Sequence, residues 1–185
     1  IIQNAYCESS QFLQSNLQNI QIINSDFSFS LIQEVDFTNA VIDKTQFKNT
    51  TAFSLKLDGA KITNSNFTKV VLSQTNINNA VITNTDFSEA NMTDVNILNS
   101  NITSSLFTSS SFNNTQLDKD LIQNCDFQKL MASKMKITNS TISNVNFNNM
   151  IAASYEMVNV KLENSSAIGA NFYNGVISTS QFNVA

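Results

Sequence analysis

The side chains of this sequence that could act as nucleophiles are its many serine and threonine hydroxyls and the thiols of Cys7 and Cys125. A hydroxyl becomes a strong nucleophile only beside a base, and histidine, the most common base, is absent from the chain. No nucleophile elbow, zinc-protease helix, phosphate-binding loop or dinucleotide fingerprint occurs. We therefore predict that the protein is not an enzyme and has no catalytic or cofactor-binding residues.

Metal and disulfide chemistry have little to build on either. A transition-metal site needs several imidazole or thiolate ligands close together, and the two cysteines are the only residues of that kind. They lie 118 residues apart in the sequence. We predict no metal site, no cofactor and no disulfide, and we expect both cysteines to act as small apolar residues.

An apolar residue recurs at every fifth position. From Ile2 to Phe182, all 37 such positions are Ile, Leu, Phe, Met, Ala or Cys, and 12 of the 14 phenylalanines fall in this register. We call these positions anchors. Along a helix, anchors five residues apart would leave a common face, and along a straight strand they would alternate between faces. The chain must therefore turn once per repeat to keep every anchor inside.

The columns beside the anchors support this interpretation. Two residues before an anchor the residue is usually small, such as Ala60, Ala80 or Thr85, which indicates a second inward position. Two residues after an anchor it is asparagine in 17 of 37 cases, and glycine at Gly59 and Gly169. Because asparagine and glycine tolerate a positive φ, we predict a corner at this position of each repeat.

Residues 20 apart carry like side chains, whereas residues 15 apart do not. This spacing favours four repeats per coil over three. It predicts an all-β fold, a four-sided parallel β-helix (solenoid) of about nine 20-residue coils, roughly 43 Å long at the usual strand spacing. The predicted core ladders are Phe27, Phe47, Phe67, Phe87, Phe107, Phe127 and Phe147, and Ile22, Ile42, Ile62, Ile82, Ile102, Ile122 and Ile142.

We expect a single domain over residues 1–185. The apolar content of 42% is enough for a core, and no apolar run approaches the roughly 18 residues of a membrane span, so we predict no membrane insertion. The sequence starts at Ile1 without a signal-peptide pattern, and we expect it to be part of a longer chain. Open coils present unpaired strand edges, for which we expect flanking caps, end contacts with a partner or end-to-end association.

Several repeats follow the motif A-(D/N)-L-X-X. Ala90-Asn91-Met92 and Ala170-Asn171-Phe172 do so with Met or Phe in place of Leu, and Ser25-Asp26-Phe27 also has Ser in place of Ala. The sequence thus resembles the pentapeptide-repeat family over essentially all 37 repeats. The resemblance implies a right-handed quadrilateral β-helix. It implies little about function, because the family is defined by its scaffold and a fold does not imply a function.

Bulky residues interrupt the small inward column in two successive coils. Leu130 and Met150 precede the alanine anchors at 132 and 152, and Met135 and Tyr155 follow in the same column. We expect these residues to fill the volume that the small anchors leave empty.

Asp120 is the only charged residue in the inward column. Burial of an unpaired carboxylate is costly. We therefore expect a local bulge or an outward turn at this position rather than a functional acid.

The charge of the chain bears on two kinds of partner. There are 10 Lys, no Arg and 14 acidic residues, and most aromatic residues are anchors, so we predict no nucleic-acid binding. Some members of the family that this chain resembles protect bacterial topoisomerases such as gyrase from quinolones by mimicking DNA. A duplex as long as the predicted rod carries roughly 25 negative charges, whereas the net charge here is −4. We therefore keep a DNA-mimicking, topoisomerase-binding protein as the alternative function.

One side of the predicted coil, beside the anchors Phe12, Ile32, Ala52 and Leu72, carries outward apolar residues where Asn, Thr, Ser or Gln is usual. Such a patch is typical of a protein-binding surface. We therefore expect a non-catalytic structural scaffold or spacer that mediates protein–protein interaction with other proteins, within a larger multi-subunit assembly. The candidate partner-binding residues are Leu31, Phe53, Val71, Met131, Ile151 and Tyr173, with Leu13 on the same side.

A second alternative is an extracellular surface fibre or an ice-binding segment. Thr63, Thr83 and Thr103 would form a flat row of hydroxyls on another side of the coil. The column beside this row contains Lys61 and Val81, which interrupt a regular threonine array.

Overall fold

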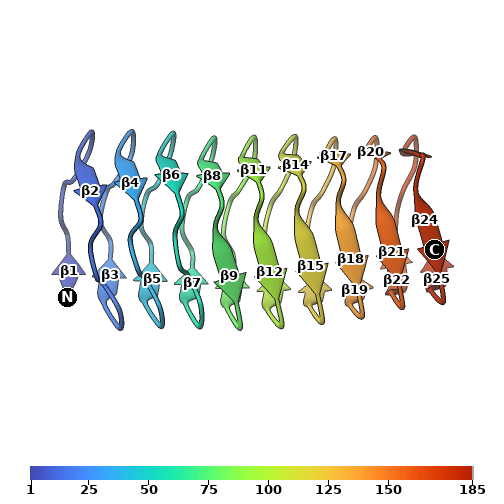
Figure 1. Ribbon diagram of the computed structural model, residues 1–185, viewed down its shortest axis with the longest axis horizontal. Helices are drawn as coiled ribbons and strands as arrows, with labels where there is room; N and C mark the ends of the chain where they lie inside the picture. The colour runs from blue at the N-terminus through green and yellow to red at the C-terminus, as the bar shows by residue number, and fades with distance from the viewer. Residues whose placement is uncertain (185) are drawn as a thin grey trace.

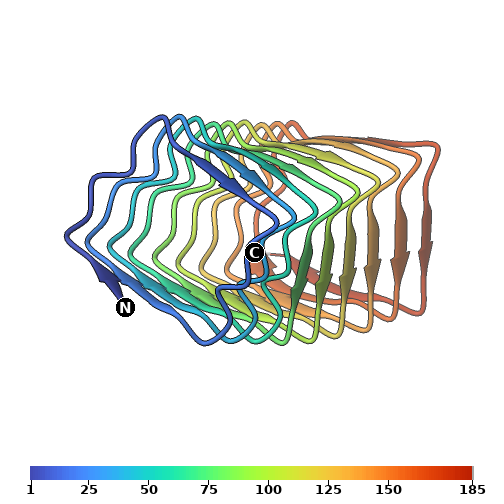
Figure 2. The same cartoon turned by 60° about the vertical axis from the view of Figure 1, so that its left-hand side comes forward.

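The computed structural model describes residues 1–184, and the side chains of residues 1–181. The chain winds into a rod of stacked coils that advances steadily from the N-terminus at one end to the C-terminus at the other (Figures 1 and 2). Each coil has 20 residues and four sides, and three of these sides carry parallel sheets. The predicted all-β, four-sided β-helix of about nine coils is confirmed. Within residues 1–184, no helix could span a membrane.

The first side of the coil forms the longest sheet. Residues 20 apart are paired, as with Ile2 and Ile22 or Ile82 and Ile102, so the isoleucine anchors lie in one line inside the coil. The same register pairs the anchor Phe182 with Leu162, although the Phe182 side chain lies outside the described residues. The strands are β1 (Ile2–Gln3), β3 (Gln21–Ile23), β5 (Val41–Asp43), β7 (Lys61–Thr63), β10 (Val81–Thr83), β13 (Asn101–Thr103), β16 (Leu121–Gln123), β19 (Thr141–Ser143), β22 (Lys161–Ser165) and β25 (Gln181–Val184).

The opposite side of the coil forms a second long sheet. In each three-residue strand the middle residue is the inward anchor, and the first and third residues point outward because side chains alternate along a strand. Met92, for example, is 1% exposed in the middle of its strand. The strands are β2 (Gln11–Leu13), β4 (Leu31–Gln33), β6 (Thr51–Phe53), β8 (Val71–Ser73), β11 (Asn91–Thr93), β14 (Ser111–Asn113), β17 (Met131–Ser133), β20 (Ile151–Ala153) and β23 (Asn171–Tyr173).

The side that carries the phenylalanine ladder contains single bridges rather than full strands. Asp86 and Leu106 form one such bridge. After each phenylalanine the chain makes a tight turn, as where the Ala90 N–H donates to the Phe87 carbonyl oxygen at 3.1 Å. From Phe27 to Phe147, ring centroids in neighbouring coils lie 4.7–5.5 Å apart, within the range of favourable aromatic packing. The ladder thus forms a continuous apolar spine inside the rod.

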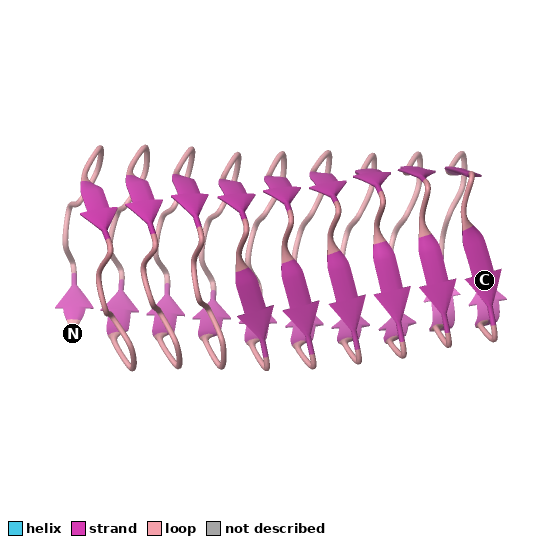
Figure 3. Cartoon of the chain, viewed as in Figure 1, coloured by secondary structure: helices cyan, strands magenta, loops and turns pink. Residues whose placement is uncertain are grey.

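The fourth side changes its backbone along the rod (Figure 3). Around Leu17, Phe37 and Leu57 the chain makes the same turn as on the phenylalanine side, with single bridges. From Ile77 onward the side consists of strands, and four of their six anchors are isoleucine, a β-branched residue that favours extended backbone. These strands are β9 (Asn76–Asn78), β12 (Asn96–Leu98), β15 (Gln116–Asp118), β18 (Lys136–Thr138), β21 (Glu156–Val158) and β24 (Val176–Ser178).

The corners lie where the sequence predicts them. Every fifth residue from Asn4 to Thr179 has a positive φ, including Gly59 and Gly169. Stacked asparagine side chains link successive coils at several corners, and the Asn24 Nδ2 donates to the Asn4 Oδ1 at 2.8 Å. Asparagine therefore serves twice, since it tolerates the left-handed conformation and it binds its counterpart in the next coil.

The bulky residues of the small inward column are all buried. Leu130 and Met150 are fully buried beside the alanine anchors, as the volume argument predicts, and Tyr155 is 8% exposed. The Tyr155 ring also requires a glycine at position 175, one coil later, because a Cβ atom on Gly175 would collide with the ring. A glycine above a tyrosine is thus a packing pair that is 20 residues apart in the sequence.

Candidate functional site

Both thiols are free, and they differ in exposure. Cys7 is half-buried and Cys125 is buried. Burial raises the pKa of the Cys125 thiol to about 11, so the thiolate, which is the nucleophilic form, is scarce at neutral pH. The Cys125 thiol lies in the small inward column and donates to the Gln123 carbonyl oxygen at 3.2 Å.

Hydroxyl side chains in the inward column tie one coil to the next. The Ser100 Oγ accepts a hydrogen bond from the Ala80 N–H at 3.1 Å, and it donates to the Ile77 carbonyl oxygen at 2.9 Å. A serine or threonine at such a position therefore acts as acceptor and donor at once. The position needs both functions, because backbone groups on either side of the hydroxyl are buried.

Asp120 occupies this column next to Ser100, and the predicted bulge or outward turn at Asp120 is wrong. The residue is 3% exposed, and it stays in register: its Oδ1 accepts from the Ser100 N–H at 2.7 Å, while its own N–H donates to the Ser140 Oγ at 3.1 Å. The parallel ladder holds the backbone of each coil against both neighbours. A bulge would break those backbone bonds, so the carboxyl group is buried in place of the serine that precedes and follows it.

The second carboxyl oxygen of Asp120 has no hydrogen-bond partner. A serine at this position would use its proton to bind a carbonyl oxygen, and a carboxylate has no such proton. Burial, together with the nearby charge of Asp118, raises the pKa of Asp120 to about 7. The protonated acid is the form that matches this position, because its O–H supplies the missing donor.

Charged residues of the fourth side are paired across a groove. A shallow groove of about 420 Å³ crosses the fourth side beside Asp118, Lys136 and Glu156. The Lys136 Nζ lies 3.2 Å from the Glu156 carboxylate. Hydrogen bonds from Thr138 and Asn139 hold the pKa of Asp118 below its ordinary value. In the part of the chain that the structure describes, no group of three or more potential metal ligands occurs.

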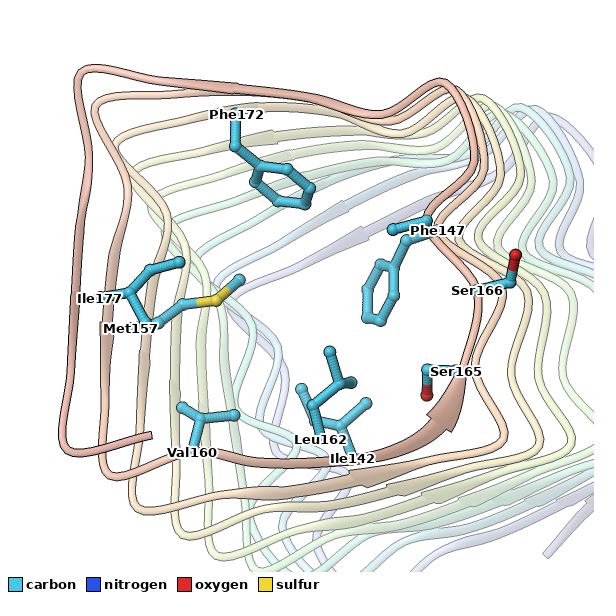
Figure 4. Close-up of a pocket in the computed structure, with 10 residues that line it drawn as sticks. Ile142, Phe147, Met157, Val160, Leu162, Ser165, Ser166, Phe172 and Ile177 are labelled. Carbon is cyan, nitrogen blue, oxygen red and sulfur yellow. The ribbon is translucent and has the colours of Figure 1, made fainter. Parts of the chain in front are cut away.

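A hollow of about 240 Å³ lies inside the coil near its C-terminal end (Figure 4). Its walls are anchors and inward residues such as Phe147, Met157 and Phe172, whose side chains point into the tube. The hollow is continuous with the core, and it adjoins the strand β25, in which the Phe182 side chain is not described. We assign no binding role to it.

The second long sheet carries the candidate partner-binding residues on its outer surface. Met131 is 55% exposed, and Phe53, Ile151 and Tyr173 are also exposed, whereas Leu31 and Val71 are half-buried. Met131 and Ile151 are paired neighbours on β17 and β20. Leu31 and Val71 lie farther along the same face, on β4 and β8. The six predicted residues therefore share one face but do not form one continuous cluster.

The outward strand positions of this face carry no charge, and charged residues occur only at its corners, at Glu34, Lys69, Glu89, Asp94, Lys129 and Lys134. We define the uncharged side as the first and third residues of strands β2, β4, β6, β8, β11, β14, β17, β20 and β23, and none of these residues is Lys, Asp or Glu. The outward positions of each of the other three sides include both lysine and acidic residues. Charged residues are depleted at the centre of protein interfaces. The absence of charge at these positions can be seen in the sequence, and it distinguishes this side independently of its apolar residues.

Two exposed residues extend the apolar surface of this side. Leu13 is 47% exposed on β2, and Phe29 is 56% exposed at the corner before β4. Phe29 lies two residues after the anchor Phe27, at the corner position that the repeat predicts. A count of phenylalanines outside the anchor column would have found it, since Phe29 and Phe53 are the only two.

Comparison with known proteins places the fold among related solenoids. The family model described as pentapeptide repeats matches in eight copies, over residues 30–68, 56–94 and 71–108. The structure is similar to HetL, a pentapeptide repeat protein involved in heterocyst differentiation regulation from the cyanobacterium Nostoc sp. strain PCC 7120. The TM-score is 0.60 and the identity 8%, over 97% of this chain and 87% of HetL.

A second similar structure is trypsin-treated QnrB1, a plasmid-mediated fluoroquinolone resistance protein. The TM-score is 0.50 and the identity 10%, over 97% of this chain and 84% of QnrB1. At such low identity both likenesses concern the fold alone. No curated protein sequence matches the chain significantly. The family match over residues 30–108, the five-residue register and the four-sided coil together confirm the resemblance of the chain to pentapeptide-repeat proteins.

Proposed function

We propose that this chain is a non-catalytic scaffold or spacer that binds another protein through its uncharged side, within a larger assembly. The observation that carries the proposal is the combination of exposed apolar residues with a lack of charge at the outward strand positions of one side, whereas the outward positions of each of the other three sides include both lysine and acidic residues. Exposed Met131, Ile151 and Tyr173 supply the apolar contact that a protein partner would cover.

The interior supports a mechanical role. Backbone hydrogen bonds join each coil to the next along the whole rod, and the phenylalanine ladder packs without interruption from Phe27 to Phe147. Stability in such a solenoid is close to a sum over coils and their interfaces. A rod of this kind holds its outer side chains at fixed spacings, which suits a spacer or a docking surface.

The chemistry of the side chains supports a non-catalytic role. The two thiols lie in inward columns, and Asp120 is enclosed by the coil. A general acid or base must reach its substrate within hydrogen-bond distance. Asp120, 3% exposed, does not meet this condition.

The DNA-mimic alternative gains no specific support from the surface. The half-buried aspartates of the phenylalanine side, such as Asp26, Asp86 and Asp126, share it with amides and hydroxyls, and the net charge of the chain is −4. The alternative remains open to a direct assay. If the purified chain protects gyrase supercoiling from a quinolone at stoichiometric concentration, the DNA mimic replaces the scaffold as the leading function.

The scaffold proposal is tested by native co-purification from cells that produce the protein. The variant Met131→Asp with Ile151→Asp places two charges on the uncharged side, and Val81→Asp places one on the opposite sheet. We expect the wild-type chain and Val81→Asp to retain the same partner, and the double variant to lose it. Equal recovery with all three chains would overturn the proposal.

A further inference from the structure

The apolar residues of the uncharged side form two groups along the rod. One group lies on β2, β4, β6 and β8, and the other lies on β17, β20 and β23. The strand midway between them is β11, whose outward residues are Asn91 and Thr93. If two copies meet face to face in antiparallel directions, with a two-fold axis at β11, then β2, β4 and β6 of one copy face β23, β20 and β17 of its mate, and β8 faces β14.

The axis also determines which side chains meet. It lies parallel to the strands, so β2 faces β23 and β4 faces β20 of the second copy, with first residues opposite first residues and third opposite third. Leu31 then lies opposite Ile151 of the second copy, and Leu13 lies opposite Tyr173. A two-fold interface is self-complementary, so each of these apolar pairs occurs twice.

The other face-to-face arrangement gives a poorer match. A two-fold axis along the rod makes the copies parallel and places the first residue of each strand opposite the third residue of the same strand. Leu31 would then meet Gln33, and Met131 would meet Ser133. In this arrangement the only apolar pair would be Ile151 with Ala153. The antiparallel arrangement has the two apolar pairs Leu31–Ile151 and Leu13–Tyr173, although it places Phe53, Met131 and Val71 opposite Ser133, Thr51 and Ser111. A polar group against hydrocarbon costs free energy unless the polar group finds another hydrogen bond. The residue pattern therefore favours the antiparallel arrangement.

Electrostatics permits the self-contact. No like charges meet across the centre of the interface, because the uncharged side has none. Two acidic corners of the central coil approach their own copies at the borders, and both are engaged within the chain: Glu89 lies 3.5 Å from the Lys69 Nζ, and Asp94 accepts from the Asn114 Nδ2 at 2.6 Å.

The available area sets the strength of the contact. Nine strands at about 4.8 Å, each about 10 Å long, give a flat area of roughly 400 Å² per copy. A standard protein interface covers about 800 Å² per partner. Exposed Phe29 at the adjoining corner adds to the flat area. We therefore expect a dimer that forms in a concentration-dependent manner rather than an obligate one.

We infer that the partner of the uncharged side is a second copy of this chain, bound as an antiparallel two-fold dimer through the Leu31–Ile151 and Leu13–Tyr173 contacts. The inference rests on the proposed function, because it uses the same side, and it names the partner. Fibre growth is not expected, because a two-fold contact of this kind closes on itself.

Sedimentation equilibrium of the purified chain tests the inference, over about 10 µM to 1 mM, the range of a weak complex. We expect the wild type to dimerise and Ile151→Asp to raise the dissociation constant at least about tenfold, because the substitution places a carboxylate against the Leu31 side chain in both symmetric contacts. Val81→Asp is the matched control, since Val81 is 42% exposed and Ile151 is 45% exposed. A wild type that stays monomeric throughout, or equal weakening by both variants, would overturn the inference.

A charge-pair experiment tests the antiparallel geometry. The chain with Leu31→Lys and Ile151→Glu forms two opposite-charge contacts in the proposed dimer, whereas the chain with Leu31→Lys and Ile151→Lys forms two like-charge contacts. We expect the first chain to dimerise at least about tenfold more tightly than the second, a difference typical of interfacial charge pairs. Equal dissociation constants for the two chains would contradict the antiparallel geometry.

The inference and the proposed function fail in different ways. If the wild type is monomeric and its Ile151 face binds a different protein in native co-purification, the dimer is wrong and the scaffold proposal stands. A dimer that Ile151→Asp dissolves, with no other protein retained, identifies the second copy as the partner. If the Asp variants keep both dimerisation and their native partners, both proposals are wrong.

Discussion

The two long sheets of the rod share one backbone and one core, and they differ in what they present to solvent. Ile82 on one sheet and Met92 on the other are each 1% exposed, in strands of the same length and register. On the outer surface of the first sheet, side chains form hydrogen bonds, such as the one between the Thr83 and Thr103 Oγ1 atoms at 3.1 Å. The outward strand positions of the second sheet carry no charged residue and include the exposed Ile151. The inward columns thus determine the fold, and the outward columns are free to differ between sides.

The largest effect is expected from a change in the shared interior. Phe107→Ala removes a ring that packs between Phe87 and Phe127, and we expect a loss of about 3–5 kcal/mol in the free energy of unfolding. Denaturant titration measures it. Because the ladder supports every side, both sheets should lose protection from hydrogen exchange. A loss below about 1 kcal/mol would show that the ladder is not the common support.

The next effect depends on pH and concerns the buried Asp120. Its pKa is raised from 3.8 to about 7 in the folded state, so folding takes up a proton between these values and stability falls as the pH rises through that window. Asp120→Ser restores the hydroxyl of Ser100 and Ser140. We expect this variant to be more stable than the wild type by about 2–4 kcal/mol at pH 8.

The advantage of Asp120→Ser should disappear as the pH falls below about 4, where the acid is protonated in both the folded and unfolded states. Thermal unfolding of the two chains at pH 4, 6 and 8 checks both ends of the window. An advantage independent of pH would show that Asp120 destabilises through its shape rather than through its charge.

A smaller effect is expected at a corner. Gly59 has a φ of 69°, and a Cβ atom there would collide with the Asn39 Oδ1. We expect Gly59→Ala to lower the free energy of unfolding by about 1–2 kcal/mol. Adding Asn39→Ala removes the collision and leaves the cost of the backbone conformation, so the double variant separates the two causes in a denaturant titration. Equal stability of Gly59→Ala and wild type would contradict the collision.

The smallest effect on stability is expected at the outward positions. Ile151, Leu106 and Val81 are 45%, 44% and 42% exposed on three different sides. Each single change to Asp should alter the free energy of unfolding by no more than about 0.5 kcal/mol. Denaturant titration of the three variants provides the check. A large loss in any one of them would mean that its side supports the fold as well as the surface.

The sequence predicts the fold in detail because one constraint, an apolar residue inside every five, repeats along the whole chain. The corners follow from asparagine and glycine, and the number of sides follows from the like residues 20 apart. The change of backbone on the fourth side was not predicted, since Leu57 and Ile77 both satisfy the anchor pattern while they favour different local conformations.

Asp120 was predicted wrongly for a related reason. The prediction considered only the cost of burying a charge. A bulge would also break backbone hydrogen bonds, and protonation removes the charge. Gly175 was missed because its role depends on the Tyr155 ring beneath it. The face of the candidate site could be predicted from its outward apolar residues. The two separate groups on it emerge only when the strands are placed in order along the rod.

Site-specific photo-crosslinking tests most directly whether the uncharged side is the binding surface. A photoreactive amino acid replaces Ile151, Leu106 or Val81, one at a time, in cells that produce the protein. Similar exposure makes the three positions comparable. The predicted result is a discrete crosslinked species from position 151, to a second copy or to another protein, and none above background from positions 106 and 81. Equal crosslinking from all three positions, or a discrete species only from 106 or 81, would contradict the assignment of the interface to the uncharged side.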